Sequence, residues 1–272
     1  MIKNGMTMLW LALAAPLAHA DGDYLSPTDD RVRLSLGIMR MSSSTTLQVD
    51  SSTGTPGTDI NAENDLGLDR SDIEPKFQAM VRVGERQRLR FDYFTLDRND
   101  QKTLPLDGEP IMFRDVVLLP GDPVQTSLSL RTLGIAYGYS FWHSETLEFA
   151  ATVGINDTQI STSARVQSQT RHIYDNEDLA GPVPTLGIDA TWVVSKRFYF
   201  DGRAQYLQLH INDLDGSLGI YELDALYRFR PNVSFALGYN SVTAHLASTK
   251  IKQAGLFDFD SRGPQLFVRV EF

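Results

Sequence analysis

Apolar and polar residues alternate with a period of two along most of this chain. The C-terminal stretch shows the pattern most clearly, because Leu266, Val268, Val270 and Phe272 share one face of an extended strand. Successive side chains of a strand point to opposite faces, so such alternation predicts β-strands with one apolar face. Ten strands are expected, at about 31–49, 74–83, 88–98, 133–141, 147–155, 186–194, 198–206, 219–229, 233–239 and 264–272.

The connections between the expected strands alternate in length. Connections two, four, six and eight are tight turns at 84–87, 142–145, 195–197 and 230–232. Connections one, three, five and nine are long and polar, at 50–72, 99–123, 163–181 and 247–263, whereas the seventh, 212–216, is short. Within the second long connection, the turn sequence 104–108 followed by 111–119 predicts a small hairpin. The pattern predicts an antiparallel sheet with short turns at one end and long loops at the other.

Aromatic residues lie beside the tight turns and at the end of the last strand. They are Phe141, Trp142, Phe198, Tyr199, Tyr227, Phe229 and Phe272. Transmembrane barrels carry aromatic girdles at the membrane interfaces, short periplasmic turns, longer external loops and an even number of strands. With its strand pattern and its C-terminal strand ending in Phe272, the chain resembles small bacterial outer-membrane β-barrel proteins.

The resemblance implies an all-β fold, a closed antiparallel up-and-down transmembrane β-barrel of about ten strands, with eight or twelve as alternatives. It also implies that Phe272 is the assembly signal read by the barrel-assembly machinery. Members of this class often carry Tyr two residues before the terminal aromatic, where this chain has Val270. A soluble exported β-sandwich or lipocalin-like barrel is the other fold that fits, since alternation alone does not say which face meets solvent.

The N-terminus has the features of a secretory signal peptide. Lys3 precedes an apolar run at 6–17, and the small-x-small pattern Ala18-His19-Ala20 predicts cleavage before Asp21. The run is too short for a membrane-spanning helix, which needs about 20 residues. We therefore expect a signal peptide at 1–20, a barrel domain at 21–272, and a location in the bacterial outer membrane.

Composition narrows the expected partners. The chain has no cysteine, so no disulfide stabilises an exported fold of this size. Its net charge of −9 argues against nucleic-acid binding. No cofactor is expected, and the expected partners are outer-membrane lipids, lipopolysaccharide and the barrel-assembly machinery.

The faces opposite the apolar ones carry charged residues. A barrel of eight to ten strands is barely wider than its own side chains, so charges in its interior must pair. A salt-bridged, closed interior and a narrow pore lined by both signs are the two interpretations. The expected interior charges are seven basic and seven acidic: Arg33, Lys76, Arg82, Arg90, Asp92, Glu148, Asp189, Asp201, Arg203, Glu222, Asp224, Arg228, Arg269 and Glu271.

The sequence offers little enzyme chemistry. His143, Ser144 and Glu145 have the residue types of a hydrolytic triad, but three consecutive residues cannot adopt the required geometry. The chain resembles the omptin proteases in size and expected strand number. Those enzymes use acidic pairs and an Asp-x-His arrangement at the outer rim, whereas His210 is preceded two residues earlier by Gln208. No catalytic residue is predicted.

Metal binding is not predicted either. The sequence at 213–216 resembles part of a calcium loop, but the later ligands and the final Glu are missing. The acidic stretches at 59–72 and 175–178 are expected to be solvated loops. Leu66 and Leu68, in the first of these stretches, can tuck over the mouth of a barrel.

These observations favour a non-enzymatic integral barrel with a structural, surface-interaction or narrow-channel role. The alternative is a hydrolase at the external rim, either omptin-like or lipid A-modifying, with His172 or His210 as base. Convergence of either histidine with loop carboxylates in one external pocket would favour the enzyme. An interior filled by paired charges would favour the non-enzymatic barrel.

Overall fold

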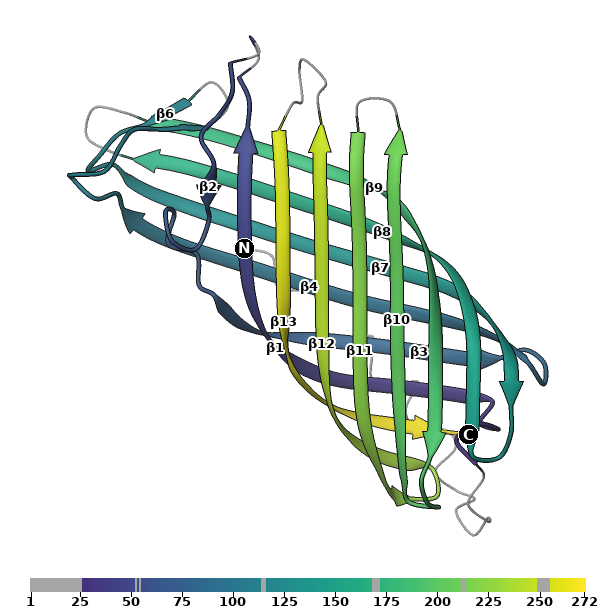
Figure 1. The fold of residues 1–272 in the computed structure, drawn as a ribbon. Helices are drawn as coiled ribbons and strands as arrows, with labels where there is room; N and C mark the ends of the chain where they lie inside the picture. Colours follow the sequence, from purple (N-terminus) through teal and green to yellow (C-terminus); the bar gives the residue numbers. More distant parts are fainter. Residues whose placement is uncertain are drawn as a thin grey trace, which may run out of the picture.

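Ten long strands close into an antiparallel barrel in the computed structural model (Figure 1), in the order β1-β3-β4-β7-β8-β9-β10-β11-β12-β13 and back to β1. The structure describes residues 26–51, 53, 55–113, 116–167, 172–211, 214–248 and 255–272, so the expected signal peptide lies outside the described residues. The strands are β1 (Val32–Val49), β2 (Ile60–Asn61), β3 (Ser71–Arg82), β4 (Gln87–Thr103), β5 (Ile111–Phe113), β6 (Val116–Leu118), β7 (Pro123–His143), β8 (Leu147–Gln167), β9 (His172–Val193), β10 (Phe198–Ile211), β11 (Leu214–Arg230), β12 (Val233–Ser248) and β13 (Gly255–Glu271). The predicted all-β class and the count of ten barrel strands are confirmed.

The C-terminal strand closes the ring. β13 pairs with β1 from Arg33 opposite Glu271 to Val49 opposite Gly255. Next to the Arg33–Glu271 pair, the amide of Phe272 donates to the carbonyl of Val32 at 2.9 Å. Closure leaves no free edge along this seam, which is how a barrel satisfies its backbone groups within a membrane.

The two ends of the barrel differ. We call the end with the short connections 83–86, 144–146, 194–197 and 231–232 the turn end, and the opposite end the loop end. Figure 1 shows the turn end at the bottom, together with the C-terminus. Within the described residues, no helix is long and apolar enough to cross a membrane.

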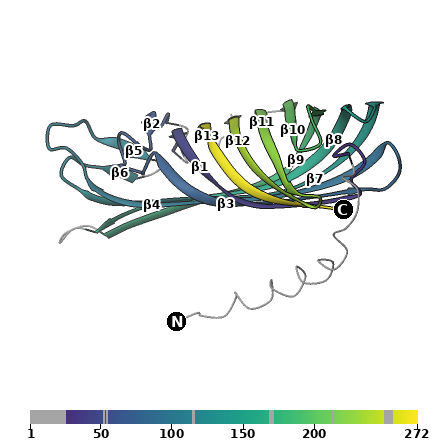
Figure 2. The ribbon, with the colours of Figure 1, turned by 90° about the horizontal axis from the view of Figure 1, so that it is seen from below.

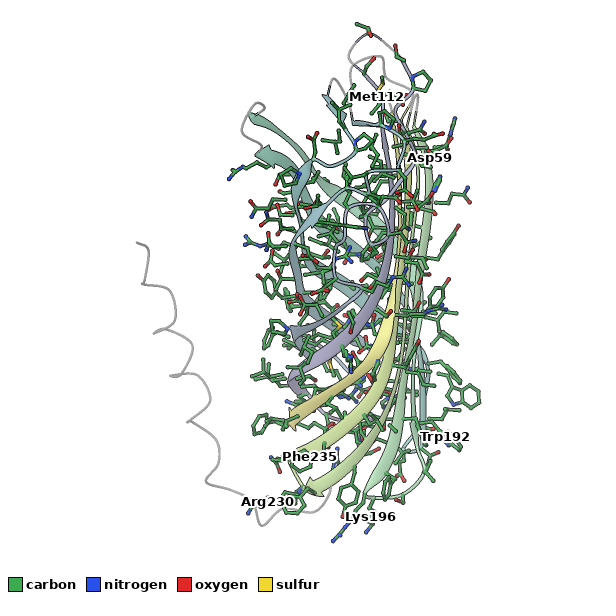
Figure 3. All side chains as sticks on the ribbon, turned by 90° about the vertical axis from the view of Figure 1, so that its left-hand side faces the viewer. Asp59, Met112, Trp192, Lys196, Arg230 and Phe235 are labelled. Carbon is green, nitrogen blue, oxygen red and sulfur yellow. The ribbon has the colours of Figure 1, made fainter. Side chains whose placement is uncertain are left out.

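Large apolar side chains cover the outside of the barrel. Figure 3 shows Trp192 pointing away from the ribbon, and this side chain is 55% exposed. Near the turn end, aromatic rings contact one another across neighbouring strands, with ring centroids 4.9 Å apart for Phe198 and Tyr227 and 5.7 Å apart for Trp192 and Phe200. The outward residues include Leu36, Ile38, Phe77, Val81, Phe91, Tyr93, Leu133, Ile135, Tyr137, Tyr139, Val153, Ile155, Leu186, Ile188, Tyr206, Tyr221, Leu223, Leu237, Tyr239, Leu266 and Val268. The sequence predicts these residues to share the apolar face.

Several strands extend further toward the loop end than predicted. Connections expected at 99–123, 163–181 and 247–263 are partly strand, because β4 pairs with β7 as far as Thr103 and Pro123, and β8 pairs with β9 as far as Gln167 and His172. The prediction missed these parts because polar residues occupy both faces there. Within the expected turn at 104–108, the amide of Gly108 donates to the carbonyl of Pro105 at 3.3 Å, and the following stretch 111–119 contains the paired strands β5 and β6.

Two seams of the barrel are paired only near the turn end. β3 pairs with β1 only up to Ser71 opposite Ser42, and above that point the short β2 pairs with β1 instead. The β9–β10 ladder ends at Leu186 opposite Tyr206. In Figure 1 the group from β1 through β13 to β10 runs at a steep angle to the group from β4 to β9. Figure 2, from below, shows the same strands curving round from one group into the other.

Candidate functional site: the charged interior of the barrel

Charged side chains fill the turn-end part of the barrel interior. All fourteen residues that the sequence predicts to face inward are buried or half-buried, whereas the apolar residues between them are half-buried or exposed. Small inward residues make room for them. A Cβ added to Gly138 would lie 3.0 Å from Cγ of Arg88, and one added to Gly238 would lie 1.7 Å from a carboxylate oxygen of Asp224.

One cluster surrounds Glu148 on β8, close to the turn end. Arg82 donates to both carboxylate oxygens at 2.9 Å, and Arg88 lies 3.3 Å away. The hydroxyl of Ser140 also donates to Glu148, whose side chain is fully buried. Two guanidinium groups around one carboxylate leave net positive charge, which Asp189 balances at 3.3 Å from Arg88.

A second cluster joins Arg228 on β11 to Glu271 on β13, with a 2.7 Å ion pair. Tyr199 also donates to Glu271. Arg228 reaches Asp30 at 3.4 Å, so the segment before β1 is tied to the turn end. Burial raises the pKa of the Asp30 carboxyl to about 7, Arg33 opposes this shift, and the nearby Glu271 carboxylate adds to it.

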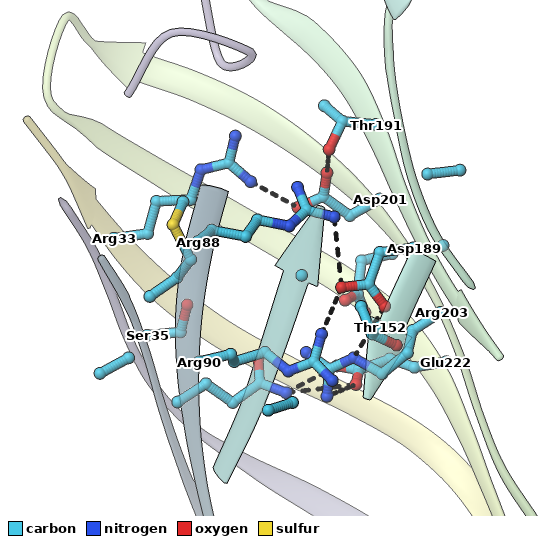
Figure 4. Close-up of a pocket in the computed structure, with 18 of the residues that line it drawn as sticks. Arg33, Ser35, Arg88, Arg90, Thr152, Asp189, Thr191, Asp201, Arg203 and Glu222 are labelled. Atoms are coloured by element: carbon cyan, nitrogen blue, oxygen red, sulfur yellow. Dashed lines mark hydrogen bonds and ion pairs between the residues drawn. The ribbon is translucent and has the colours of Figure 1, made fainter. Parts of the chain in front are cut away.

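A third cluster lies midway along the barrel. Arg90 pairs with Asp189, and Arg203 lies 3.0 Å from Asp92 and 3.3 Å from Glu222. Figure 4 shows four of these side chains converging on one cavity: Arg90 from β4, Asp189 from β9, Arg203 from β10 and Glu222 from β11. Acids and bases alternate in space, so each charge has a partner of opposite sign.

Some of these contacts cross the lumen. Lys76 on β3 binds Glu222 on β11 at 2.7 Å, and Arg33 on β1 lies 3.7 Å from Asp201 on β10. Neither pair of strands is adjacent in the barrel. Arg269 on β13 completes the bridge by binding Asp201. The side chains of facing walls therefore meet in the middle.

The interior also contains charges that the predicted set missed. Arg88 has the same parity as Arg90, and that spacing could have identified it. Arg98 shares this parity at the end of the expected strand 88–98, but its partners could not be predicted, because one of them comes from the first long loop: Arg98 binds Glu63 at 2.8 Å and the hydroxyl of Thr45 at 2.8 Å. These three side chains are buried, and they tie the loop at 50–70 to β1 and β4.

The same loop folds into the loop end of the barrel. Leu66 and Leu68, which the sequence places over the mouth of the barrel, are 1% and 2% exposed. Leu68 packs with the inward-facing Leu47, Leu128 and Phe257. The loop therefore forms a cap over the interior, which we call the loop-50 cap (residues 55–70).

The candidate base His210 does not lie in an interior site, whereas His143 at the turn end lies 3.3 Å from Asp29 and 3.6 Å from Glu148. His210 lies 2.5 Å from Asp215 across the β10–β11 hairpin, on the outside of the barrel, with 72% of its side chain exposed. His245 forms a similar exposed pair with Asp258. The structure does not describe the side chain of His172. Within the described residues, no group of three or more His, Asp or Glu could hold a metal ion.

Known proteins share the fold. No protein-family model and no curated protein sequence matches this chain. Among solved structures, the outer membrane protease OmpT from Escherichia coli is similar at a TM-score of 0.55 and 11% identity, covering 93% of this chain and 100% of that chain. The translocator domain of the autotransporter NalP from Neisseria meningitidis is similar at a TM-score of 0.51 and 10% identity, covering 91% of this chain and 90% of that chain. At these identities the likeness shows the fold, that of a bacterial outer-membrane β-barrel.

Proposed function

We propose that this chain is an integral barrel protein of the bacterial outer membrane, with an interior closed to ion passage and a structural or surface-interaction role. The outward apolar band supports membrane insertion, because a soluble barrel with so many exposed aliphatic and aromatic residues would aggregate. Lipids, including lipopolysaccharide, would contact this band. The terminal strand with Phe272 would be the part that the barrel-assembly machinery reads.

The lumen-crossing ion pairs carry the proposal of a closed interior. Lys76–Glu222 and Arg33–Asp201 join walls that face each other, so an ion on the barrel axis would have to break them. Separating one partner of a buried pair costs about 3–5 kcal/mol. A narrow channel would require these side chains to line a path, whereas here they span it.

The same geometry offers nothing in favour of the hydrolase alternative. Of the two candidate bases, His210 is described, and it lies on the outer surface with Asp215 as its partner. Its ring does not face a pocket that contains a nucleophile. The proposal therefore includes no catalytic step.

Single cysteines test insertion and orientation, since the chain has no native cysteine. Asp107→Cys at the loop end and Lys196→Cys at the turn end both substitute exposed positions. We expect intact cells to label Asp107→Cys with a maleimide-polyethylene glycol too large for porins, and to label Lys196→Cys only after the outer membrane is permeabilised. Equal labelling of both variants in intact cells, or recovery of the protein in the soluble fraction, would contradict the proposal.

A further inference from the structure

The interior changes character above the charged clusters. A cavity there encloses about 800 Å³ of space between atoms, part of it open to solvent, and its walls are mainly apolar. We call it the loop-end chamber. Its apolar lining residues are Met39, Phe94, Leu130, Leu218, Ile220, Val242, Ala244, Phe257 and Phe259. Barrel interiors are ordinarily polar, so an apolar chamber requires an explanation.

Charged side chains lie below the chamber, and the loop-50 cap lies near its upper wall. Its floor consists of Lys76, Asp92, Arg203 and Glu222, whose charges already pair with one another. Ala62 and Leu68 of the loop-50 cap belong to the cluster that packs on Phe257 of the chamber wall, although no residue of the cap lines the cavity itself. A ligand cannot reach the chamber from below unless the charged side chains of the floor move.

The backbone ladder of the side wall is interrupted between β9 and β10. Their ladder ends at Leu186 opposite Tyr206; above it, the described part of β9 pairs only with β8, and β10 pairs only with β11. β9 carries Pro182 and Pro184 where the pairing stops, and proline has no N–H to donate to a neighbouring strand. The described side chains of β9 contribute nothing to the chamber lining.

The gap lies at the upper margin of the outward apolar band. Leu186 and Tyr206, which flank it, are 62% and 49% exposed on the outside, and Gln208 and His210 follow on β10. Inside, the chamber is lined by Asn156 on β8, opposite Val183, and by Gln205 on β10, next to Tyr206. The interrupted ladder thus lies between the apolar chamber and the upper margin of the outward apolar band.

We propose that the loop-end chamber holds an acyl chain of a lipid from the surrounding leaflet, which enters between β9 and β10. Apolar walls left in contact with water cost roughly 25 cal/mol per Å², and a hydrocarbon chain removes that contact. The amides of Asn156 and Gln205 lie where the ester oxygens of such a lipid would rest.

Photocrosslinking in vesicles of a single phosphatidylcholine tests this inference, which rests on the membrane insertion proposed above. p-Benzoylphenylalanine replaces Phe94 in the chamber, Phe235 on the outside, or Met80 in the charged part of the interior. Adducts with the mass of the lipid are expected at positions 94 and 235 and not at 80. An adduct at 235 without one at 94 would overturn the inference and leave membrane insertion intact, whereas no adduct at 235 would contradict insertion itself.

A substitution that fills the chamber distinguishes crosslinking to a lipid inside the chamber from crosslinking to a lipid on the outer surface. Ala244→Trp places a large ring in the chamber, and Ala204→Trp places the same ring on the outward face of β10. Combined with the probe at 94, Ala244→Trp should reduce the adduct to the level of the probe at 80, and Ala204→Trp should leave it unchanged. Heat-shifted migration on a gel shows that each variant is folded. An undiminished adduct in folded Ala244→Trp would overturn the inference.

Discussion

Glu222 shows how one carboxylate holds facing walls of the barrel together. It receives hydrogen bonds from Lys76 at 2.7 Å and from Gln265 at 2.8 Å, and Arg203 lies 3.3 Å away. These donors come from β3, β13 and β10. Removing the charge would leave two buried cations without their shared partner.

We expect Glu222→Gln to lower the free energy of unfolding by about 3–5 kcal/mol, because breaking a buried ion pair leaves an uncompensated charge. Urea unfolding in vesicles measures the change. Asp260→Asn is the matched control, since its pair with Arg262 is exposed and such pairs contribute about 0–1 kcal/mol. Equal stability of the two variants would show that the interior pairs do not hold the walls together.

Gly238 tests the packing of the interior. A Cβ at this position would lie 1.7 Å from Asp224 and 2.9 Å from the backbone oxygen of Leu223, so Gly238→Ala should destabilise the barrel by about 1–3 kcal/mol through overpacking. At Gly202, the nearest atom to an added Cβ is 3.9 Å away, and Gly202→Ala should be neutral or slightly stabilising. The measurement is the temperature at which half of each variant has lost the gel migration of the folded barrel, compared between the two variants. A tolerated Gly238→Ala would mean that the interior is looser than described.

Asp30 should make stability depend on pH. Its folded pKa of about 7 lies above the unfolded value of about 3.9, so the folded state binds the proton more tightly. Its stabilising contribution is therefore complete below the unfolded pKa and is lost as pH rises toward 7. Asp30→Asn should remove this loss, so its unfolding midpoint should exceed that of the natural chain more at pH 8 than at pH 4. A constant difference between the two proteins across this range would contradict the shift.

At the scale of the elements, the alternation of apolar and polar residues predicts the strand segments that carry the outward apolar band. It does not predict the parts of the strands outside that band. The strand that ends at Phe272 and the outward positions on every barrel strand follow from the period of two. The upper parts of β4, β7 and β8 do not, because polar residues lie on both faces there. The loop-50 cap could be anticipated only from Leu66 and Leu68, and its anchor Arg98–Glu63 joins residues that no local pattern connects.

The chamber escaped prediction for a different reason. Its apolar residues Leu218 and Ile220, for example, have the inward parity of the charged Glu222 and Asp224 on the same strand. The sequence shows them as breaks in the alternation, and only the closed ring brings them together. Pro182 and Pro184 were a visible signal for the end of the β9–β10 ladder.

The loop-50 cap provides a prediction at this scale. Leu66 is 1% exposed within it, whereas Leu106, in the connection between β4 and β7, is 86% exposed. Leu66→Ser should detach the cap and make residues 50–70 sensitive to protease added outside vesicles, since a buried apolar anchor is lost. Leu106→Ser should leave the digestion pattern of this loop unchanged. Protease resistance in both variants would mean that Leu66 does not anchor the cap.

At the scale of the whole molecule, the barrel combines a lipid-facing outer surface with an interior divided into layers. Ion pairs fill the turn end and the middle, the apolar chamber follows, and the loop-50 cap covers the loop end. Each layer arises from a different part of the sequence: alternating charges on the strands, apolar residues at the same parity, and one long loop. Two of these layers obstruct the axis independently.

Conductance in planar lipid bilayers tests the closed interior most directly. The refolded natural chain, shown to be inserted by its heat-shifted band, should give no discrete current steps, because Lys76–Glu222 and Arg33–Asp201 span the lumen. Discrete, reproducible openings of the natural chain would contradict the account and would make the interior charges the lining of a pore.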